Sequence, residues 1–195
     1  MMNTLDRKYF DDVYAANEDP WNFETSEYEK AKYAATIAAL TKDRYDSAFE
    51  IGCSLGVLTK LLTQKCTSIL AVDIVEKPLE IARRRLAGIP SVEFRKMSVP
   101  AEFPHENFDL ILLSEVGYYL SREDLKELQH KLFDHLRPMG QLLLVHWTPL
   151  VHDYPLTGDQ VHDSFQVFAD DQNRMRNVLS QREEKYRLDL FEKTV

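Results

Sequence analysis

The sequence predicts an α/β protein built on a doubly wound, mostly parallel seven-stranded sheet with helices on both faces. Strand and helix patterns alternate from residue 47 to residue 146, which is the order that right-handed crossovers between parallel strands produce. The segment Phe108–Ser114 is apolar at nearly every position, as expected of a strand that helices cover on both sides. Two further strand patterns near the end of the chain complete the expected seven.

Short apolar runs mark the first five strands, at 47–51, 68–72, 91–95, Phe108–Ser114 and 141–146. Apolar side chains at helical spacing mark the helices around them. These side chains are Tyr33, Ile37 and Leu40; Leu58, Leu61 and Leu62; Ile81, Ala82 and Leu86; Leu125, Leu128, Leu132 and Leu136; and Val161, Phe165 and Phe168.

Proline, glycine and capping residues set the expected ends of these helices. Pro78 suits the first turn of one helix. Ser121 with Asp124 forms a capping pattern at the start of the next. Pro138 and Gly140 are expected to end that helix.

The chain after the fifth strand is less regular. Residues 147–158 contain two prolines and a glycine and are expected to form a loop. Thr157 and Gln160 can cap the helix that follows. Two late strands at 177–182 and 185–192 would be separated by only two glutamates, which are poor hairpin residues.

Length and composition predict one globular domain. The 195 residues compare with roughly 150 residues for a typical domain. We expect a helical cap at 1–45, a ligand-binding core at 46–146, and a loop, a helix and terminal strands at 147–195. The formal charge of −8 argues against nucleic acid as a partner.

Other compositional signals point to the cytoplasm. No apolar run reaches the roughly 18 residues that a membrane helix needs. Residues 1–12 lack the apolar stretch of a signal peptide. The spacing of Cys53 and Cys66 fits no zinc site, so both are expected to be free thiols.

Small residues follow the first predicted strand, where ligands bind in open α/β sheets. Gly52 and Gly56 would let the backbone bend and approach a ligand closely. Counting from Gly52, the third position is Ser54 and the sixth is Val57, so the dinucleotide pattern G-x-G-x-x-G fails. A nicotinamide or flavin protein is therefore disfavoured, and a plain strand-to-helix turn is an alternative.

The run Glu50-x-Gly52-x-Ser54-x-Gly56 resembles the first motif of class I S-adenosylmethionine-dependent methyltransferases, with serine in place of the middle glycine. That family has a Rossmann-like sheet and places a carboxylate after the second strand to bind both ribose hydroxyls. Asp73, followed by Ile74, stands there. The resemblance implies that these residues bind the cofactor. The alternative is that Asp73 caps the following helix.

After the third strand the same family often has an acidic residue near the adenine amino group. This chain has Met97-Ser98-Val99 instead. The resemblance implies that Ser98 accepts a hydrogen bond there, and that Met97 or Val99 packs on the purine face.

Further motifs resemble the nodulation-protein-S-like (NodS-like) methyltransferases from about residue 14 to residue 190. They are Asp19-Pro-Trp21-x-Phe23-x-Thr25, Tyr28-Glu29-x-x-Lys32-Tyr33, Phe108-Asp-Leu-Ile, Ser114-Glu115-Val116-x-Tyr118-Tyr119, His146-Trp147 and Asp153-Tyr154-Pro155-Leu156-x-Gly158. The founding member of that family N-methylates the deacetylated, amino-bearing sugar of a chitin-like oligosaccharide. The resemblance supports the reaction more firmly than the substrate.

Within this resemblance, Lys32 would pair with the methionyl carboxylate of the cofactor, while Trp21 and Tyr28 would close over it and Ser114 would line the same pocket. The aromatic faces would attract the sulfonium by about 1 kcal/mol. The alternatives are that Trp21 anchors the cap helix and that Lys32 is solvated.

The candidate catalytic residues are Glu115, Tyr119 and His146, after the fourth and fifth strands. Glu115 or His146 would take a proton from an amine acceptor or hold the acceptor. The alternatives are a strand-end His146 satisfied by hydrogen bonds, a Glu115 that lines the cofactor pocket, and a packing role for Tyr118 and Tyr119. The histidine spacing fits no metal site, so none is expected.

The leading interpretation is an S-adenosylmethionine-dependent methyltransferase that yields S-adenosylhomocysteine. Its acceptor would be a small polar molecule, most plausibly the amine of an amino sugar or deacetylated chitooligosaccharide, bound partly by the loop at 147–158. A catalytically silent cofactor-binding partner module and a nucleotide-binding oxidoreductase are the alternatives. No membrane partner is expected, and the oligomeric state is left open.

Overall fold

Seven strands form one sheet in the order β3-β2-β1-β4-β5-β7-β6 in this computed structural model, which describes residues 2–172 and 175–194. Positions 1, 173, 174 and 195 of the expected 1–195 unit lie outside the described residues. The strands are β1 (Tyr45–Ile51), β2 (Cys66–Asp73), β3 (Val92–Lys96), β4 (Phe108–Ser114), β5 (Leu136–Trp147), β6 (Met175–Arg182) and β7 (Tyr186–Lys193). The first five pair in parallel, and β7 runs antiparallel to both β5 and β6. The predicted doubly wound, mostly parallel sheet is confirmed.

Six α-helices and one short 3₁₀ turn surround the described sheet. They are α1 (Arg7–Ala16), α2 (Glu27–Ala38), α3 (Val57–Leu62), α4 (Glu76–Arg85), η1 (Gly117–Tyr119), α5 (Arg122–His135) and α6 (Gly158–Gln172). The predicted caps are confirmed. The Ser121 hydroxyl accepts the Asp124 N–H at 3.1 Å. Thr157 and Gln160 cap α6 reciprocally, at 3.0 and 3.2 Å.

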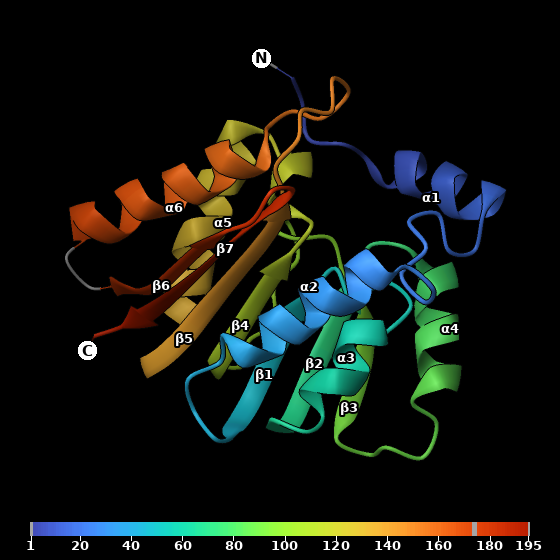
Figure 1. Cartoon of the computed structure of the whole chain (residues 1–195), viewed down its shortest axis with the longest axis horizontal. Helices are drawn as coiled ribbons and strands as arrows, with labels where there is room; N and C mark the ends of the chain where they lie inside the picture. The colour runs from blue at the N-terminus through green and yellow to red at the C-terminus, as the bar shows by residue number, and fades with distance from the viewer. Residues whose placement is uncertain (1, 173–174, 195) are drawn as a thin grey trace.

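Helices cover both faces of the sheet because its strands are apolar on both. In β1, Phe49 and Ile51 belong to the apolar layer that includes side chains of α1, α5 and α6. Ala48 belongs to the opposite layer, with side chains of α2 and α3. Figure 1 shows α2 and α3 crossing the sheet on one face. This two-sided burial leaves the carboxyl edge of the parallel strands as the place for a ligand.

The expected boundary between α5 and β5 differs from the structure. The helix α5 ends at His135, before Pro138 and Gly140, because Leu136 already has the extended backbone with which β5 begins. The pairing then shifts between Phe108 and Leu110, so residues 137–140 form a bulge in the strand rather than a helix end.

The hairpin of β6 and β7 has three connecting residues instead of two. The Glu183 N–H donates to the Tyr186 carbonyl at 2.9 Å. This longer loop removes the difficulty of placing two glutamates in a tight turn. None of the described helices has the length and apolar character needed to cross a membrane.

Candidate active site

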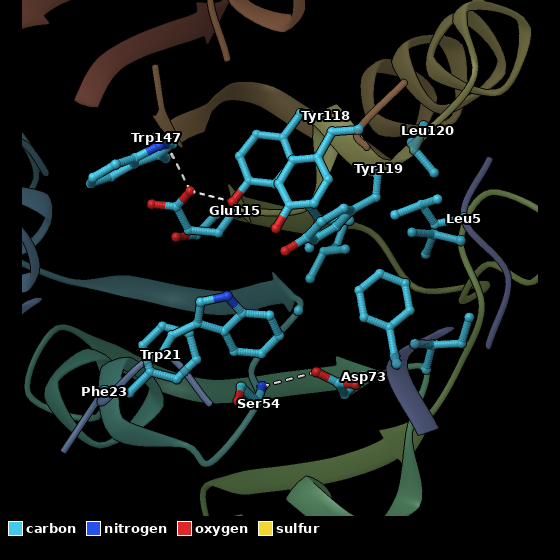
Figure 2. Close-up of a pocket in the computed structure, with 18 of the residues that line it drawn as sticks. Leu5, Trp21, Phe23, Ser54, Asp73, Glu115, Tyr118, Tyr119, Leu120 and Trp147 are labelled. Atoms are coloured by element: carbon cyan, nitrogen blue, oxygen red, sulfur yellow. Dashed lines mark hydrogen bonds between the residues drawn. The ribbon is translucent and has the colours of Figure 1, made fainter. Parts of the chain in front are cut away.

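The carboxyl ends of the parallel strands open into a cavity of about 480 Å³. Residues after β1, β2, β3 and β4 line it, and side chains from α1, α2 and the loop before α6 cover it. Figure 2 shows Trp21, Ser54 and Asp73 on one side, across from Glu115 and Tyr118. The predicted site residues that line the cavity are Trp21, Tyr28, Lys32, Gly52, Ser54, Asp73, Ile74, Ser98, Val99, Ser114, Glu115 and Tyr119.

The loop after β1 approaches the loop after β4 closely at Gly52. A Cβ at this position would overlap the Val116 side chain, and the φ of +80° favours glycine independently. The backbone N–H of Ser54 turns toward β2 and donates to the Asp73 carboxylate at 3.0 Å. The glycine-rich bend and the carboxylate are thus parts of one structure.

Asp73 closes β2 with a buried carboxylate. Its second oxygen accepts the Val75 N–H at 3.0 Å, just before α4. Burial raises the pKa of Asp73 to about 6, although the backbone donors oppose the shift. A carboxylate offers about four lone-pair positions, and the backbone N–H groups of Ser54, Ile74 and Val75 do not fill all of them. Asp73 can therefore hold the turn and bind a ligand at the same time.

Glu115 lies at the other end of the cavity and is held by three donors. Lys32 Nζ lies 2.5 Å from Oε1, while the Tyr118 hydroxyl and the Trp147 N–H donate to Oε2 at 2.7 and 2.8 Å. The backbone of Glu115 has a φ of +58°, in the left-handed region that this residue type rarely adopts. These contacts aim the carboxylate into the cavity.

Lys32 is buried between two carboxylates, so the alternative of a solvated side chain is wrong. Its ammonium lies 3.0 Å from Glu29 as well as 2.5 Å from Glu115. Burial lowers the pKa of Lys32, but the two carboxylates outweigh burial and the pKa is raised. Burial raises the pKa of Glu29, against the opposing effect of Lys32. A methionyl carboxylate at Lys32 would compete with these partners.

Sequence reasoning assigned no role to Glu29 or Tyr14, although both line the cavity. The spacing of Glu29 and Lys32, three residues apart on one helix, is the signal for their ion pair. Tyr14 belongs to the buried face of α1, and nothing in the sequence distinguishes it from a packing residue.

Aromatic rings form much of the cavity wall. Trp21 stacks on Phe23 with ring centroids 5.5 Å apart and meets Tyr14 edge-on at 5.7 Å. On the other side, Tyr118 stacks on Tyr154 at 5.2 Å. Such faces suit a cationic or sugar ligand.

Two residues of the glycine motif lie behind the cavity wall, which corrects their expected contact with the cofactor. Glu50 accepts the Thr59 hydroxyl at 2.6 Å, and burial raises its pKa to about 7. Gly56 begins α3 in a left-handed conformation and faces Ala82 of α4, which leaves no room for a side chain. Their contribution to a ligand site is to shape the loop.

His146 does not face the cleft, so the expectation that it acts there as a base is wrong. Its ring is fully buried and Nε2 accepts the Gly117 N–H at 3.0 Å. Burial, His162 and the charge of Lys32 lower the pKa of His146 well below its ordinary value. The alternative reading, a satisfied histidine at the end of a strand, fits the structure.

The loop before α6 contributes Val151 and Tyr154 to the cavity, while His152 and Asp153 are exposed. Among the described residues, no cluster of three or more histidine, cysteine or acidic side chains could hold a metal ion. Cys53 and Cys66 are buried free thiols.

This sheet order, with a cavity at its carboxyl edge between a glycine bend and a carboxylate, defines the Rossmann-like fold of class I methyltransferases. The solved structure of the N-methyltransferase NodS from Bradyrhizobium japonicum WM9, in complex with S-adenosylhomocysteine, has this fold. It superimposes with a TM-score of 0.83 at 19% identity, over 96% of this chain and 99% of that one. The sequence model of the Nodulation protein S (NodS) family matches residues 7–147, and the chain belongs to that family.

Two other proteins are similar to this chain. Nodulation protein S of Bradyrhizobium diazoefficiens is 32% identical over 106 residues, which are 54% of this chain and 51% of the relative. A solved protein from Pseudomonas syringae, provisionally assigned as a methyltransferase, is 34% identical with a TM-score of 0.71, over 86% of this chain and all of that one. The chain spans about half the length of the curated relatives it matches.

Proposed function

We propose that the chain is an S-adenosylmethionine-dependent methyltransferase that N-methylates the amine of an amino sugar or deacetylated chitooligosaccharide. The observation that carries the proposal is one cavity with Asp73 at one end and Glu115 at the other. The carboxylate of Glu115 accepts hydrogen bonds from three donors. S-adenosylmethionine, when bound, supplies an electrophilic methyl group. The protein then has to bind and orient the cofactor and the acceptor, and to keep water out of the cavity.

The residues at the Asp73 end fit an adenosine. The remaining lone-pair capacity of the Asp73 carboxylate suits the hydroxyls of a ribose. Met97 and Val99 offer apolar contact for a purine, and Ser98 offers a hydroxyl. The close approach of Gly52 to Val116 keeps the space beside the bend narrow.

The aromatic wall fits the rest of the cofactor. Trp21 and Tyr14 line the cavity with rings in contact, and the Tyr14 hydroxyl lies next to that of Ser54. Their ring faces would attract a sulfonium by about 1 kcal/mol. Within this proposal Trp21 and Tyr28 cover the bound molecule, and Lys32 holds the carboxylates of Glu29 and Glu115 in place.

Glu115 is proposed to hold the acceptor amine. Three of its roughly four lone-pair positions are used by Lys32, Tyr118 and Trp147, so one remains for an N–H of the acceptor. A hydrogen bond to this position aligns the nitrogen lone pair, and the carboxylate can receive the amine proton. The Tyr118 and Tyr154 rings provide a stacking surface for a sugar.

The acceptor class rests on the NodS family and on the chemistry of Glu115 and the aromatic rings. Labelled methyl transfer from S-adenosylmethionine to glucosamine and deacetylated chitooligosaccharides tests it. N-acetylglucosamine is the matched control, since its nitrogen is an amide. We expect label on the free amines and none on the amide.

Two outcomes would reject the proposal in different ways. Equal labelling of free amines and N-acetylglucosamine would exclude N-methylation of an amine. Binding of S-adenosylhomocysteine in a calorimeter without transfer to any amino sugar would favour the catalytically silent module. NADH serves as the control ligand, and we expect it not to bind.

A further inference from the structure

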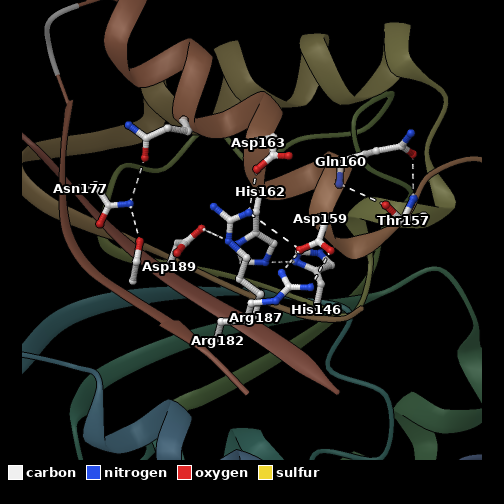
Figure 3. A network of polar contacts seen from close by, with 12 residues as sticks. His146, Thr157, Asp159, Gln160, His162, Asp163, Asn177, Arg182, Arg187 and Asp189 are labelled. Atoms are coloured by element: carbon white, nitrogen blue, oxygen red, sulfur yellow. Dashed lines mark hydrogen bonds and ion pairs between the residues drawn. The ribbon is translucent and has the colours of Figure 1, made fainter. Parts of the chain in front are cut away.

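A chain of buried polar side chains lies behind the cavity, between β5, α6 and β7 (Figure 3). His146, His162 and Asp189 are each 0% exposed. Nδ1 of His146 lies 3.1 Å from Nε2 of His162, and Nδ1 of His162 lies 2.7 Å from Oδ2 of Asp189. Nε of Arg187 lies 2.9 Å from the same carboxylate oxygen. The function proposed above uses none of these side chains.

The Gly117 backbone, at one end of this hydrogen-bonded network, determines where the histidine protons lie. The Gly117 N–H can only donate, so Nε2 of His146 must accept and carries no proton. A neutral His146 therefore holds its proton on Nδ1 and donates it to His162. His162 accepts at Nε2 and donates from Nδ1 to Asp189. Every hydrogen bond thus runs in one direction, from Gly117 toward Asp189.

The local electrostatics agree with this order. Burial lowers the pKa of His162, against the opposing effect of Asp189, and keeps the ring neutral. Burial raises the pKa of Asp189, but His162, Ser180 and Arg187 together outweigh burial and hold the pKa below its ordinary value. The negative charge of Asp189 therefore favours the tautomer of His162 that leaves Nε2 open to His146.

The Gly117 end of this network supports the turn that carries the acceptor side of the cavity. Gly117 lies two residues after Glu115 and begins η1. This turn places Tyr118 and Tyr119 on the cavity wall. A Cβ at Gly117 would lie 2.9 Å from Nε2 of His146, so the imidazole packs directly against this backbone. The Tyr118 ring also meets the His146 ring, with centroids 5.4 Å apart.

Packing alone does not require this arrangement. A buried polar group costs free energy unless it is hydrogen-bonded, and apolar side chains of similar volume often stabilise a core as well or better. A hydrogen-bonded network instead fixes one geometry, although Oδ1 of Asp189 has no hydrogen-bond partner among the described residues. The geometry that is fixed here is the position of the Gly117 N–H.

The geometry points to His146, His162 and Asp189 as positioning residues, which hold the Gly117 N–H and thereby orient Glu115 and Tyr118 toward the acceptor. The inference rests on the proposed methyl transfer. It gives His146 a role in turnover without contact with cofactor or acceptor.

Two variants of one residue separate the two hydrogen bonds of His146. The amide of His146→Gln can reach the position of Nε2 and accept from Gly117, whereas the shorter His146→Asn reaches only the position of Nδ1. We expect His146→Asn to lower kcat for a deacetylated chitooligosaccharide about tenfold, and His146→Gln to recover most of that loss. The Kd of S-adenosylhomocysteine should change by less than about twofold in both. His130→Asn, at an exposed histidine on α5, is the control.

A second measurement needs no acceptor. Imidazole ¹⁵N NMR at neutral pH should show His146 and His162 neutral, each with its proton on Nδ1. Hydrogen exchange of the Gly117 amide should be about tenfold faster in His146→Asn than in the wild type, and slower in His146→Gln than in His146→Asn.

The results distinguish this inference from the proposed function. A proton on Nε2 of His146, or wild-type kcat and wild-type Gly117 exchange in His146→Asn, would overturn the positioning role. A wild-type protein that methylates no amine would overturn the proposed function instead. The NMR and exchange data would then decide whether this network positions Gly117.

Discussion

The hydroxyl of Tyr14 lies 2.5 Å from the hydroxyl of Ser54 and links the cap helix α1 to the bend after β1. Ser54 stands where the resembling methyltransferase motif has its middle glycine, so this contact depends on the departure from the motif. Lys77 strengthens the link, because its ammonium donates to the Tyr14 carbonyl at 2.6 Å. The cap is thus attached to the floor of the cavity at the predicted cofactor site.

Removing either hydroxyl should weaken cofactor binding. We expect Tyr14→Phe and Ser54→Ala each to raise the Kd of S-adenosylhomocysteine about fivefold, which corresponds to about 1 kcal/mol for one hydrogen bond. Because both changes remove the same bond, the double variant should be no weaker than either single variant. Calorimetric titration measures all three. A double variant whose loss is the product of the single losses would show that the residues act independently.

The Asp73 carboxylate should contribute more to cofactor binding than the Tyr14 link. Replacing it in Asp73→Asn removes the charge and one acceptor oxygen, and we expect the Kd of S-adenosylhomocysteine to rise roughly thirtyfold, or about 2 kcal/mol. The same titration measures this. An unchanged Kd would mean that Asp73 only holds the turn between Ser54 and Val75.

The strands and the meeting of Gly52, Ser54 and Asp73 at one edge of the sheet could be predicted, because the ends of parallel strands lie at the same edge. The run Phe108–Ser114 is a strand with those bounds, and Gly52, Ser54 and Asp73 lie where the ends of parallel strands meet. The capping side chains of α5 and α6 were also local signals.

The end of the cavity around Glu115 could not be predicted in the same way, since its geometry depends on contacts between distant segments. Glu115 is held by Lys32, which lies 83 residues earlier. His146 follows a buried strand, so its position along the sequence suggested the cleft, whereas Gly117 and His162 draw its ring behind the wall. The direction of a side chain at the end of a strand depends on tertiary contacts, so neither the hydrophobic periodicity nor a sequence motif predicts it.

The buried ammonium of Lys32 should be essential to stability. Lys32→Met leaves two carboxylates, Glu29 and Glu115, without their cation, and we expect the free energy of unfolding to fall by about 3–5 kcal/mol. Lys30→Met, at an exposed lysine of the same helix, is the matched control and should cost less than about 1 kcal/mol. Urea denaturation measures both.

A second change should restore part of the loss. Adding Glu29→Gln to Lys32→Met removes one uncompensated charge, so the double variant should be more stable than Lys32→Met alone. If the double variant is instead less stable, repulsion between the two carboxylates is not the cause of the loss.

Glu50 should make stability depend on pH between about 4.5 and 7. Burial raises its pKa from 4.5 to about 7 in the folded protein, so the folded state binds this proton more tightly than the unfolded chain does. The stabilisation is complete below the unfolded pKa and is lost as the pH rises through the folded value. Ionisation of the carboxylate then lowers the free energy of unfolding by on the order of 3 kcal/mol. Glu50→Gln keeps an acceptor for the Thr59 hydroxyl without the charge.

We therefore expect Glu50→Gln to match the wild type in thermal unfolding at pH 4.5 and to exceed it clearly at pH 8. Asp73 also titrates in this range, and its charge helps to raise the pKa of Glu50, so this coupling is part of the expected difference at high pH. Glu80→Gln, at an exposed position of α4, is the control. Its unfolding temperature should differ from that of the wild type by the same small amount at both pH values. A Glu50→Gln advantage that is equal at pH 4.5 and pH 8 would contradict a buried carboxyl with a raised pKa, because the advantage would then arise without ionisation.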